Sequence, residues 1–287
     1  MKLFNRIGKV LPIAAVALLN LTANAQKTIT LKFNPANNAK YAMSATTKSV
    51  ATQMGMDINM DMTMDMNCTV TPQQGKDKLM TMQYTNIKLD MDIMGQKLNL
   101  NSNETNAQSE PFKKLTTKQF GCVIAPDGKI SKVVGVDSLA SVFGAGNPAA
   151  QYFDEDAIKS SIGQYFSLYP NKPIAVGETW SNIYSVTNRI KLNAKVTYTL
   201  QKVENNLAYI KIASTLTTDS AQKINFNGMD FDMALGGTQN GEMVVDTQTG
   251  IYTSSTLVQD LKGTITAMGQ KIPMTVKSNI ASSCQKQ

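Results

Sequence analysis

Residues 54–70 read MGMDINMDMTMDMNCTV. Every even-numbered position in this segment is apolar, and every odd-numbered position is Gly, Asp, Asn or Thr. A strict period of two places the two sets of side chains on opposite faces of a β-strand, whereas a helix would mix them around its circumference. At about 3.3 Å per residue, such a strand is about 50 Å long. The sequence therefore predicts a long, curved sheet with one apolar face and one wet face.

The same alternation returns later in the chain, at residues 191–200, where apolar side chains occupy every even position. Turn sequences of hairpin type separate β-like segments in both halves, at Pro126-Asp127-Gly128, Asn227-Gly228 and residues 246–250. Short turns between alternating segments are typical of strands that pair with their neighbours along the chain. We therefore expect mainly antiparallel pairing.

A short Met-Gly pattern recurs at Met54-Gly55, Met94-Gly95 and Met268-Gly269, with a looser copy that begins at Gly228. In each copy, apolar residues alternate immediately after the glycine, which can adopt the positive φ of a tight turn. We interpret the four copies as related hairpins. Whether they record a duplication stays open, because glycine-led hairpins of any Met-rich β protein resemble one another.

The pattern between the two β-rich halves is helical. Asp137 and Ser138 can cap a short helix, Asp154 opens a longer one, and Pro170 and Pro173 end it. We therefore expect a mainly β fold of one or more long curved antiparallel sheets, as a half-barrel or as two lobes, with a short helical insert near the middle. The expected boundaries are a β half at 26–136, the helical insert at 137–172 and a second β half at 173–287.

Residues 1–25 have the three parts of a signal peptide: a basic stretch, the apolar run from Val10 to Leu21, and small residues at Ala23 and Ala25. Cleavage is expected before Gln26. No later segment reaches the roughly 18 apolar residues that a transmembrane helix needs. We therefore expect an exported protein of the bacterial envelope without a transmembrane segment.

Composition argues against several classes of function. The chain has no histidine, which removes the usual general base and the commonest zinc ligand. Only Arg6 and Arg189 are arginines, and the lysines do not form a patch, so nucleic-acid binding has little support. Asp57, Asp61 and Asp65 lie along one wet face instead of facing each other across a cleft. We expect no enzyme, no catalytic residue, no metal site and no cofactor.

The cysteine count constrains the disulfides without assigning them. Cys68, Cys122 and Cys284 are an odd number for an oxidising compartment, so at most one intramolecular disulfide can form, and its pairing stays open. Cys68 falls on the apolar face of the strand and is expected to be a small buried hydrophobe. Cys284 is three residues from the end, and we expect it to be the most mobile of the three.

Methionine is the strongest compositional feature, because ten of the 17 methionines lie between Met54 and Met94. Unbranched thioether side chains adapt to variable shapes, so a concave sheet face lined with them suits an apolar or lipid-like ligand. Two alternatives stay open: a structural or interaction module with an unknown protein partner, and binding of copper(I) by the soft thioethers. The candidate ligand-binding residues are Met56, Met60, Met62, Met64, Met66, Met80 and Met82.

Two segments carry a resemblance to a known family: the hairpin VIAPDGKI at residues 123–130 and PIAVGETWS at residues 173–181. They resemble a family of secreted Gram-negative bacterial proteins that is known only as a domain of unknown function. The resemblance covers most of the chain after residue 25 in its order of elements. It implies an exported, β-rich protein in the periplasm or on the outer, extracellular surface, and it implies no activity and no role for any residue.

Overall fold

The computed structural model describes residues 28–73, 75–93, 95–144, 153–188, 190–226, 229–267 and 269–287, and the expected signal peptide lies outside them. The first strands are β1 (Lys40–Gln53), β2 (Met56–Pro72), β3 (Lys78–Ile93), β4 (Gln96–Asn101), β5 (Gln119–Ile124) and β6 (Ile130–Val134). The later strands are β7 (Thr179–Asn188), β8 (Ile190–Glu204), β9 (Leu207–Thr217), β10 (Gln222–Phe226), β11 (Met229–Asp246), β12 (Tyr252–Ala267) and β13 (Gln270–Lys286). The helices are short: α1 (Glu110–Leu115), α2 (Val136–Ala140), the 3-10 turn η1 (Ser141–Phe143) and α3 (Glu155–Phe166).

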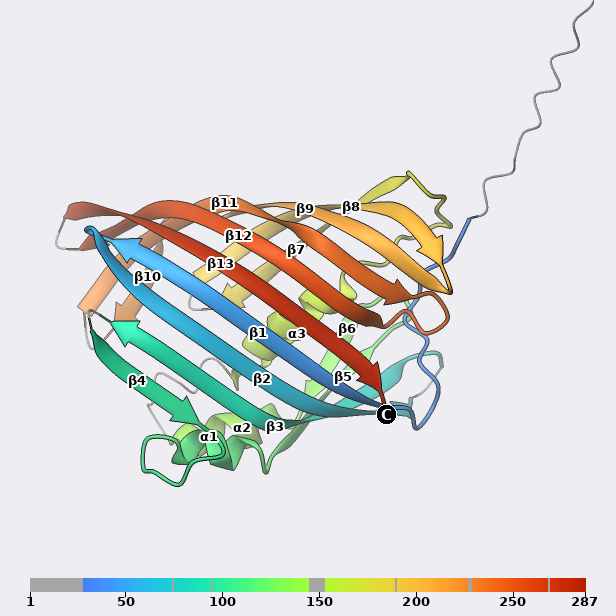
Figure 1. The fold of residues 1–287 in the computed structure, drawn as a ribbon, viewed down its shortest axis with the longest axis horizontal. Coiled ribbons are helices and arrows are strands. Elements are labelled where there is room, and N and C mark those ends of the chain that lie inside the picture. The colour runs from blue at the N-terminus through green and yellow to red at the C-terminus, as the bar shows by residue number, and fades with distance from the viewer. Residues whose placement is uncertain are drawn as a thin grey trace, which may run out of the picture.

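All of these strands join one antiparallel sheet (Figure 1). The order across the sheet is β6-β5-β3-β2-β1-β13-β12-β11-β9-β8-β7, with β4 added to β3 and β10 added to β11. The two β-rich halves meet where β1 pairs with β13, from Tyr41 opposite Lys286 to Gln53 opposite Met274. The predicted mainly β fold with a long antiparallel sheet is confirmed, as one sheet instead of two lobes.

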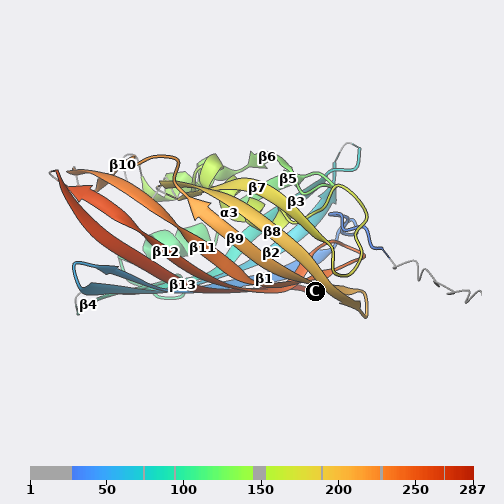
Figure 2. The same cartoon turned by 90° about the horizontal axis from the view of Figure 1, so that it is seen from above.

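The sheet bends around α3 (Figure 2). This helix lies in the chain between β6 and β7, which are the two ends of the strand order, and it contacts both of them on the concave side of the sheet. Asp154 caps the helix as predicted, because its carboxylate accepts a hydrogen bond of 2.8 Å from the backbone N–H of Ala157. The short helix α1, which the sequence pattern did not indicate, packs beside β3 and β4.

Three glycines allow adjacent strands to approach closely where the sheet curves. A Cβ atom at Gly237, Gly241 or Gly263 would lie within 2.0 Å of a backbone carbonyl oxygen of the neighbouring strand. Any other residue would therefore push β11 and β12 apart. Glycine inside a strand commonly marks such a close backbone approach.

The Met-Gly turns lie together at one end of the sheet, which we call the hairpin end (Figure 1). Gly55, Gly95 and Gly269 have positive φ angles of 76°, 86° and 77°, which glycine adopts without steric cost. They connect β1 to β2, β3 to β4 and β12 to β13, so these three predicted hairpins are confirmed. Outside the described residues lie Met94, Met268 and the turn Asn227-Gly228.

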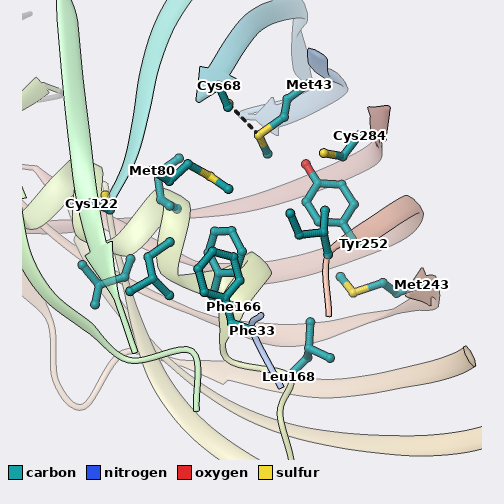
Figure 3. Packing of buried hydrophobic residues seen from close by; sticks show 14 of the residues in the cluster. Phe33, Met43, Cys68, Met80, Cys122, Phe166, Leu168, Met243, Tyr252 and Cys284 are labelled. Carbon is teal, nitrogen blue, oxygen red and sulfur yellow. Dashed lines mark hydrogen bonds between the residues drawn. The ribbon is translucent and has the colours of Figure 1, made fainter. Parts of the chain in front are cut away.

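The hydrophobic core fills the opposite end of the concave side, which we call the closed end (Figure 3). Along β8, β9 and β11 it continues toward the hairpin end, where Leu192, Leu216 and Leu235 are buried. At the closed end, Phe33, from the segment before β1, packs edge-on against Phe166 of α3, with ring centroids 5.1 Å apart. Tyr165 of the same helix stacks on Tyr252 of β12 at 5.0 Å. The helix and the segment before β1 therefore cover the concave side at this end.

Candidate functional site

The candidate methionines of β2 share one face of the sheet. Met66, Cys68 and Val70 are buried at the closed end, and the other even-numbered residues of β2 lie on the same face because side chains alternate along the strand. The odd-numbered residues face the other way, where Asp61 forms an exposed ion pair of 3.0 Å with Lys48. The predicted division of β2 into an apolar and a wet face is confirmed, and the apolar face is the concave one.

The structure divides the seven candidate residues between the two ends of the concave face. Three of them pack in the core of the closed end, with 8%, 1% and 0% of their surface exposed: Met66, Met80 and Met82. Met60, Met62 and Met64 are half-buried along the middle of β2. Met56, beside the turn, is 40% exposed. The second group lies where a ligand can reach it.

Neighbouring strands extend this accessible surface. Leu89 and Met91 of β3 lie opposite Met62 and Met60, and Leu98 of β4 lies opposite Met91. Sequence reasoning did not include these three residues or Met274 of β13 among the candidates. We give the name open face to six of the half-buried inward residues near the hairpin end: Met60, Met62, Leu89, Met91, Leu98 and Met274.

A β-bulge keeps β3 in phase with the open face. Met66 pairs with Tyr84, whereas its neighbour Asp65 pairs with Asn86, so Thr85 is an extra residue in β3. Inward positions of β3 are therefore even-numbered up to Tyr84 and odd-numbered from residue 87 onward. The inward residues Leu89 and Met91 are therefore visible in the sequence only as an alternation that shifts by one position after Thr85, and an interpretation that expects the same alternation along the whole strand misses them.

The concave face carries no charge between the hairpin end and the pair Met43–Cys284. Among the described residues, the inward positions of β1, β2, β3, β4, β7, β8, β9, β11, β12 and β13 in this region include no Asp, Glu, Lys or Arg. In this region, the charged residues of these strands point to the convex side. Because an unpaired charge is costly to remove from water, this surface favours uncharged ligands.

The three cysteines, all within the described residues, are buried and unpaired. Cys122 lies on β5, Cys68 on β2 and Cys284 on β13, and one further strand separates each neighbouring pair in the sheet. At about 4.8 Å per strand, neighbours are about 10 Å apart, beyond the roughly 7 Å that a disulfide can bridge. The expectation of a mobile Cys284 is wrong, because its residue is only 4% exposed within β13. The buried position predicted for Cys68 is confirmed.

Burial also determines the chemistry of these thiols. It raises the pKa of Cys122 and of Cys284 to about 12, and it raises the pKa of Cys68 further. The Cys68 thiol donates a hydrogen bond to the sulfur of Met43, 3.2 Å away (Figure 3). This pair is soft, but a cysteine binds metal as a thiolate, and these thiols stay protonated. Among the described residues, no group of three or more His, Cys, Asp or Glu side chains can hold a metal ion.

A separate depression of about 790 Å³ lies between α3, β7 and the β5–β6 turn. Its wall is partly charged, with Asp127, Lys129, Asp156, Lys159 and Lys191 among the lining residues. None of the candidate methionines lines it. It is therefore distinct in position and in chemistry from the open face.

Three solved structures match this chain at low sequence identity. A structure described as "lipid-protein interactions in lipovitellin" has a TM-score of 0.52 and 11% identity, and the match covers 88% of this chain and 25% of that chain. The chain thus spans a quarter of the length of that structure. The translocator domain of the autotransporter NalP from Neisseria meningitidis has a TM-score of 0.24 and 7% identity, covering 87% of this chain and 89% of that chain. A DUF1329 family protein from Desulfovibrio piger has a TM-score of 0.18 and 8% identity, covering 87% and 85%.

Of these three structures, only that of lipovitellin has a TM-score above 0.5, and at 11% identity it shows a similarity of fold alone. No curated protein matches the sequence. In the described part of the chain, no helix is long and apolar enough to cross a membrane.

The sequence also matches a protein family. A family of unknown function, DUF6263, matches residues 75–252, a range that runs from the β2–β3 turn to the start of β12. Because this match covers more than half of the chain, the protein belongs to the DUF6263 family of unknown function.

Proposed function

We propose that this protein is a non-catalytic, exported protein of the bacterial envelope that binds an apolar or lipid-like ligand on the open face. The observation that carries the proposal is an uncharged, methionine-lined surface that stays half-buried on the concave side of the sheet. Full burial of one large apolar side chain is worth about 1.5–3 kcal/mol. Six partly buried side chains therefore leave enough apolar area for a ligand chain to gain several kcal/mol.

The shape of the sheet and the chemistry of the side chains support the same proposal. Methionine adapts to ligands of variable shape because its side chain is unbranched and polarizable. The fold is similar to that of a lipovitellin structure whose description concerns lipid-protein interactions. Fold similarity does not transfer function by itself, so the weight rests on the uncharged surface.

The non-catalytic and exported parts of the proposal rest on the sequence. The chain has no histidine, and the carboxylates of β2 lie on the wet face, away from the open face. The three-part pattern of residues 1–25 supports export.

Native mass spectrometry of the mature protein, recovered from a bacterial periplasm, tests the proposal. We expect extra mass that matches a lipid. A Met62→Lys variant should lose this mass, because it places a charge on the open face. Thr63→Lys is the matched control, since Thr63 is the next residue on the opposite face and is also half-buried. A bare mass for the unmodified protein would favour a structural or interaction role, and a copper adduct would favour binding of copper(I).

A further inference from the structure

A line of uncharged polar side chains crosses the concave face beside the open face, and we call it the polar row. Its members, each opposite the next across adjacent strands, are Ser49 of β1, Ser278 of β13, Gln259 of β12, Gln239 of β11 and Ser214 of β9. Cross-strand neighbours have Cβ atoms about 5 Å apart. Five consecutive strands therefore present one continuous polar line within an otherwise apolar surface.

Much of the polar row is withdrawn from water. Ser278, Gln239 and Ser214 are 5%, 5% and 6% exposed. The hydroxyl of Ser214 is buried without a hydrogen-bond partner among the described residues, and the same holds for Ser255, which lies closer to the closed end on β12. Buried polar groups in native proteins are nearly always paired with protein, with water or with a ligand. These hydroxyls therefore require a partner that the described part of the chain does not supply.

The surroundings restrict the chemistry of that partner. No charged side chain points to the concave face in this region, so an ionised group placed there would lose its hydration without gaining a counter-ion. Serine hydroxyls and glutamine amides both donate and accept hydrogen bonds. The chemistry that fits them is an uncharged group that does the same, such as a hydroxyl or an amide, or an ester that accepts.

The polar row also leads directly into the open face. Ser49 lies opposite Met60 of β2, Met60 lies opposite Met91, and Met91 lies opposite Leu98. These three steps across the sheet span about 14 Å at the usual strand spacing. A polar group at one end of this path and an apolar chain along the rest of it match the arrangement of an amphipathic molecule.

We propose that the polar row binds the uncharged, hydrogen-bonding head of a lipid whose chain lies on the open face. The inference rests on the proposed function and adds the class of ligand: a neutral acylglycerol-like or acyl-amide lipid, in contrast to a fatty acid, a phospholipid or a cationic amphiphile.

Three probes with the same chain length test this preference on the mature protein by native mass spectrometry titration at neutral pH. They are monolauroylglycerol, which is uncharged, laurate, which is anionic, and dodecylammonium, which is cationic. We expect monolauroylglycerol to bind at least about ten-fold more tightly than either charged probe, because burial of a charge is costly on this surface.

Two variants connect the preference to the polar row. Ser214→Ala and Gln239→Leu should each weaken monolauroylglycerol binding by about 3- to 10-fold, the effect of one lost neutral hydrogen bond. Ser254→Ala is the matched control, because Ser254 is exposed on the wet face of β12, and its affinity should not change. Ser214→Ala removes one oxygen atom that has no hydrogen-bond partner among the described residues, so we expect it to fold, and it decides the result if Gln239→Leu does not fold.

The outcomes separate the two proposals. If laurate or dodecylammonium binds as tightly as monolauroylglycerol, the inference about the head is overturned while the proposed function stands. The same conclusion follows if Ser214→Ala leaves the affinity unchanged, since the row then holds only water. If none of the three probes binds, the proposed function itself is rejected.

Discussion

The variants Met82→Ala and Met62→Ala should lose different amounts of stability, because Met82 lies at the closed end of the concave face and Met62 lies on the open face. Met82 is 0% exposed on β3 and lies between Cys68 of β2 and Phe120 of β5. Removing a fully buried methionine side chain from a core costs about 2–5 kcal/mol, because the lost burial is compounded by a cavity. Met62 is half-buried and does not belong to the core. Truncating it to alanine therefore loses about half of the free energy of full burial, about 1 kcal/mol or less.

Urea unfolding measures this difference. Trp180 is the single tryptophan, and it reports on folding because it stacks on Tyr198 at 5.4 Å and donates a hydrogen bond of 2.6 Å from Nε1 to the carbonyl oxygen of Leu168. The free energy of unfolding should fall by at least about 2 kcal/mol for Met82→Ala and by about 1 kcal/mol or less for Met62→Ala, with the m-value unchanged in both.

Binding of an apolar probe should show the opposite order. Met62→Ala removes part of the open face and should weaken binding, whereas folded Met82→Ala protein should bind as the unmodified protein does. Equal losses of stability in the two variants, or weaker binding only in Met82→Ala, would refute the division of the face into a closed and an open end.

Three further predictions concern the rest of the molecule. A thiol reagent such as DTNB at pH 8 should modify no cysteine in the native protein and three after unfolding in urea, because burial keeps the pKa of each thiol well above that pH; fast labelling of the native protein would contradict the buried positions. Gly241→Ala should greatly reduce the yield of folded protein, because the new Cβ atom would lie 1.9 Å from a carbonyl oxygen of β12. The control Gly163→Ala in α3 should fold normally, as measured by circular dichroism, because the nearest atom to its Cβ would be 3.8 Å away. The carboxylate of Glu178 accepts a hydrogen bond of 2.7 Å from the backbone N–H of Ala175, which lowers the pKa of Glu178 in the folded protein, so this carboxylate stabilises the fold above its unfolded pKa and stops doing so as pH falls through its folded pKa. Glu178→Gln should therefore make the urea midpoint less dependent on pH between 6 and 3. An unchanged dependence would contradict this account.

The local part of the fold could be predicted from the sequence because its signals are local. The period of two in residues 54–70 requires only the alternation of side chains along a strand, and the Met-Gly turns require only the freedom of glycine at positive φ. The hairpins β1–β2 and β12–β13 followed from these signals. The pairing of β1 with β13 joins residues more than 200 positions apart, and no local pattern encodes it. The sequence therefore left one sheet and two lobes as alternatives.

The sequence predicted which face of the sheet carries the candidate site, but it did not predict which residues of that face stay accessible. The parity of β2 placed the candidate methionines together, but parity is the same at Met62 and at Met66, and it does not say which of them a helix covers. That distinction depends on where α3 and the segment before β1 pack, which is tertiary information. The bulge at Thr85 hid the contribution of β3, because it changes the phase of the alternation midway along the strand.

The open face is the feature of the structure that most requires an explanation. Apolar side chains continue along β2 from the closed end to Ile58, although Met60 and Met62 are only half-buried and Met56 is 40% exposed. A strand whose inner face met only water beyond the closed end would gain nothing from apolar residues there, and contiguous exposed apolar surface promotes association. Alternation with threonine or serine would have kept the strand and avoided that cost. Binding of an apolar chain accounts for both observations, because the occupant would cover the open face as the protein's own helix covers the closed end.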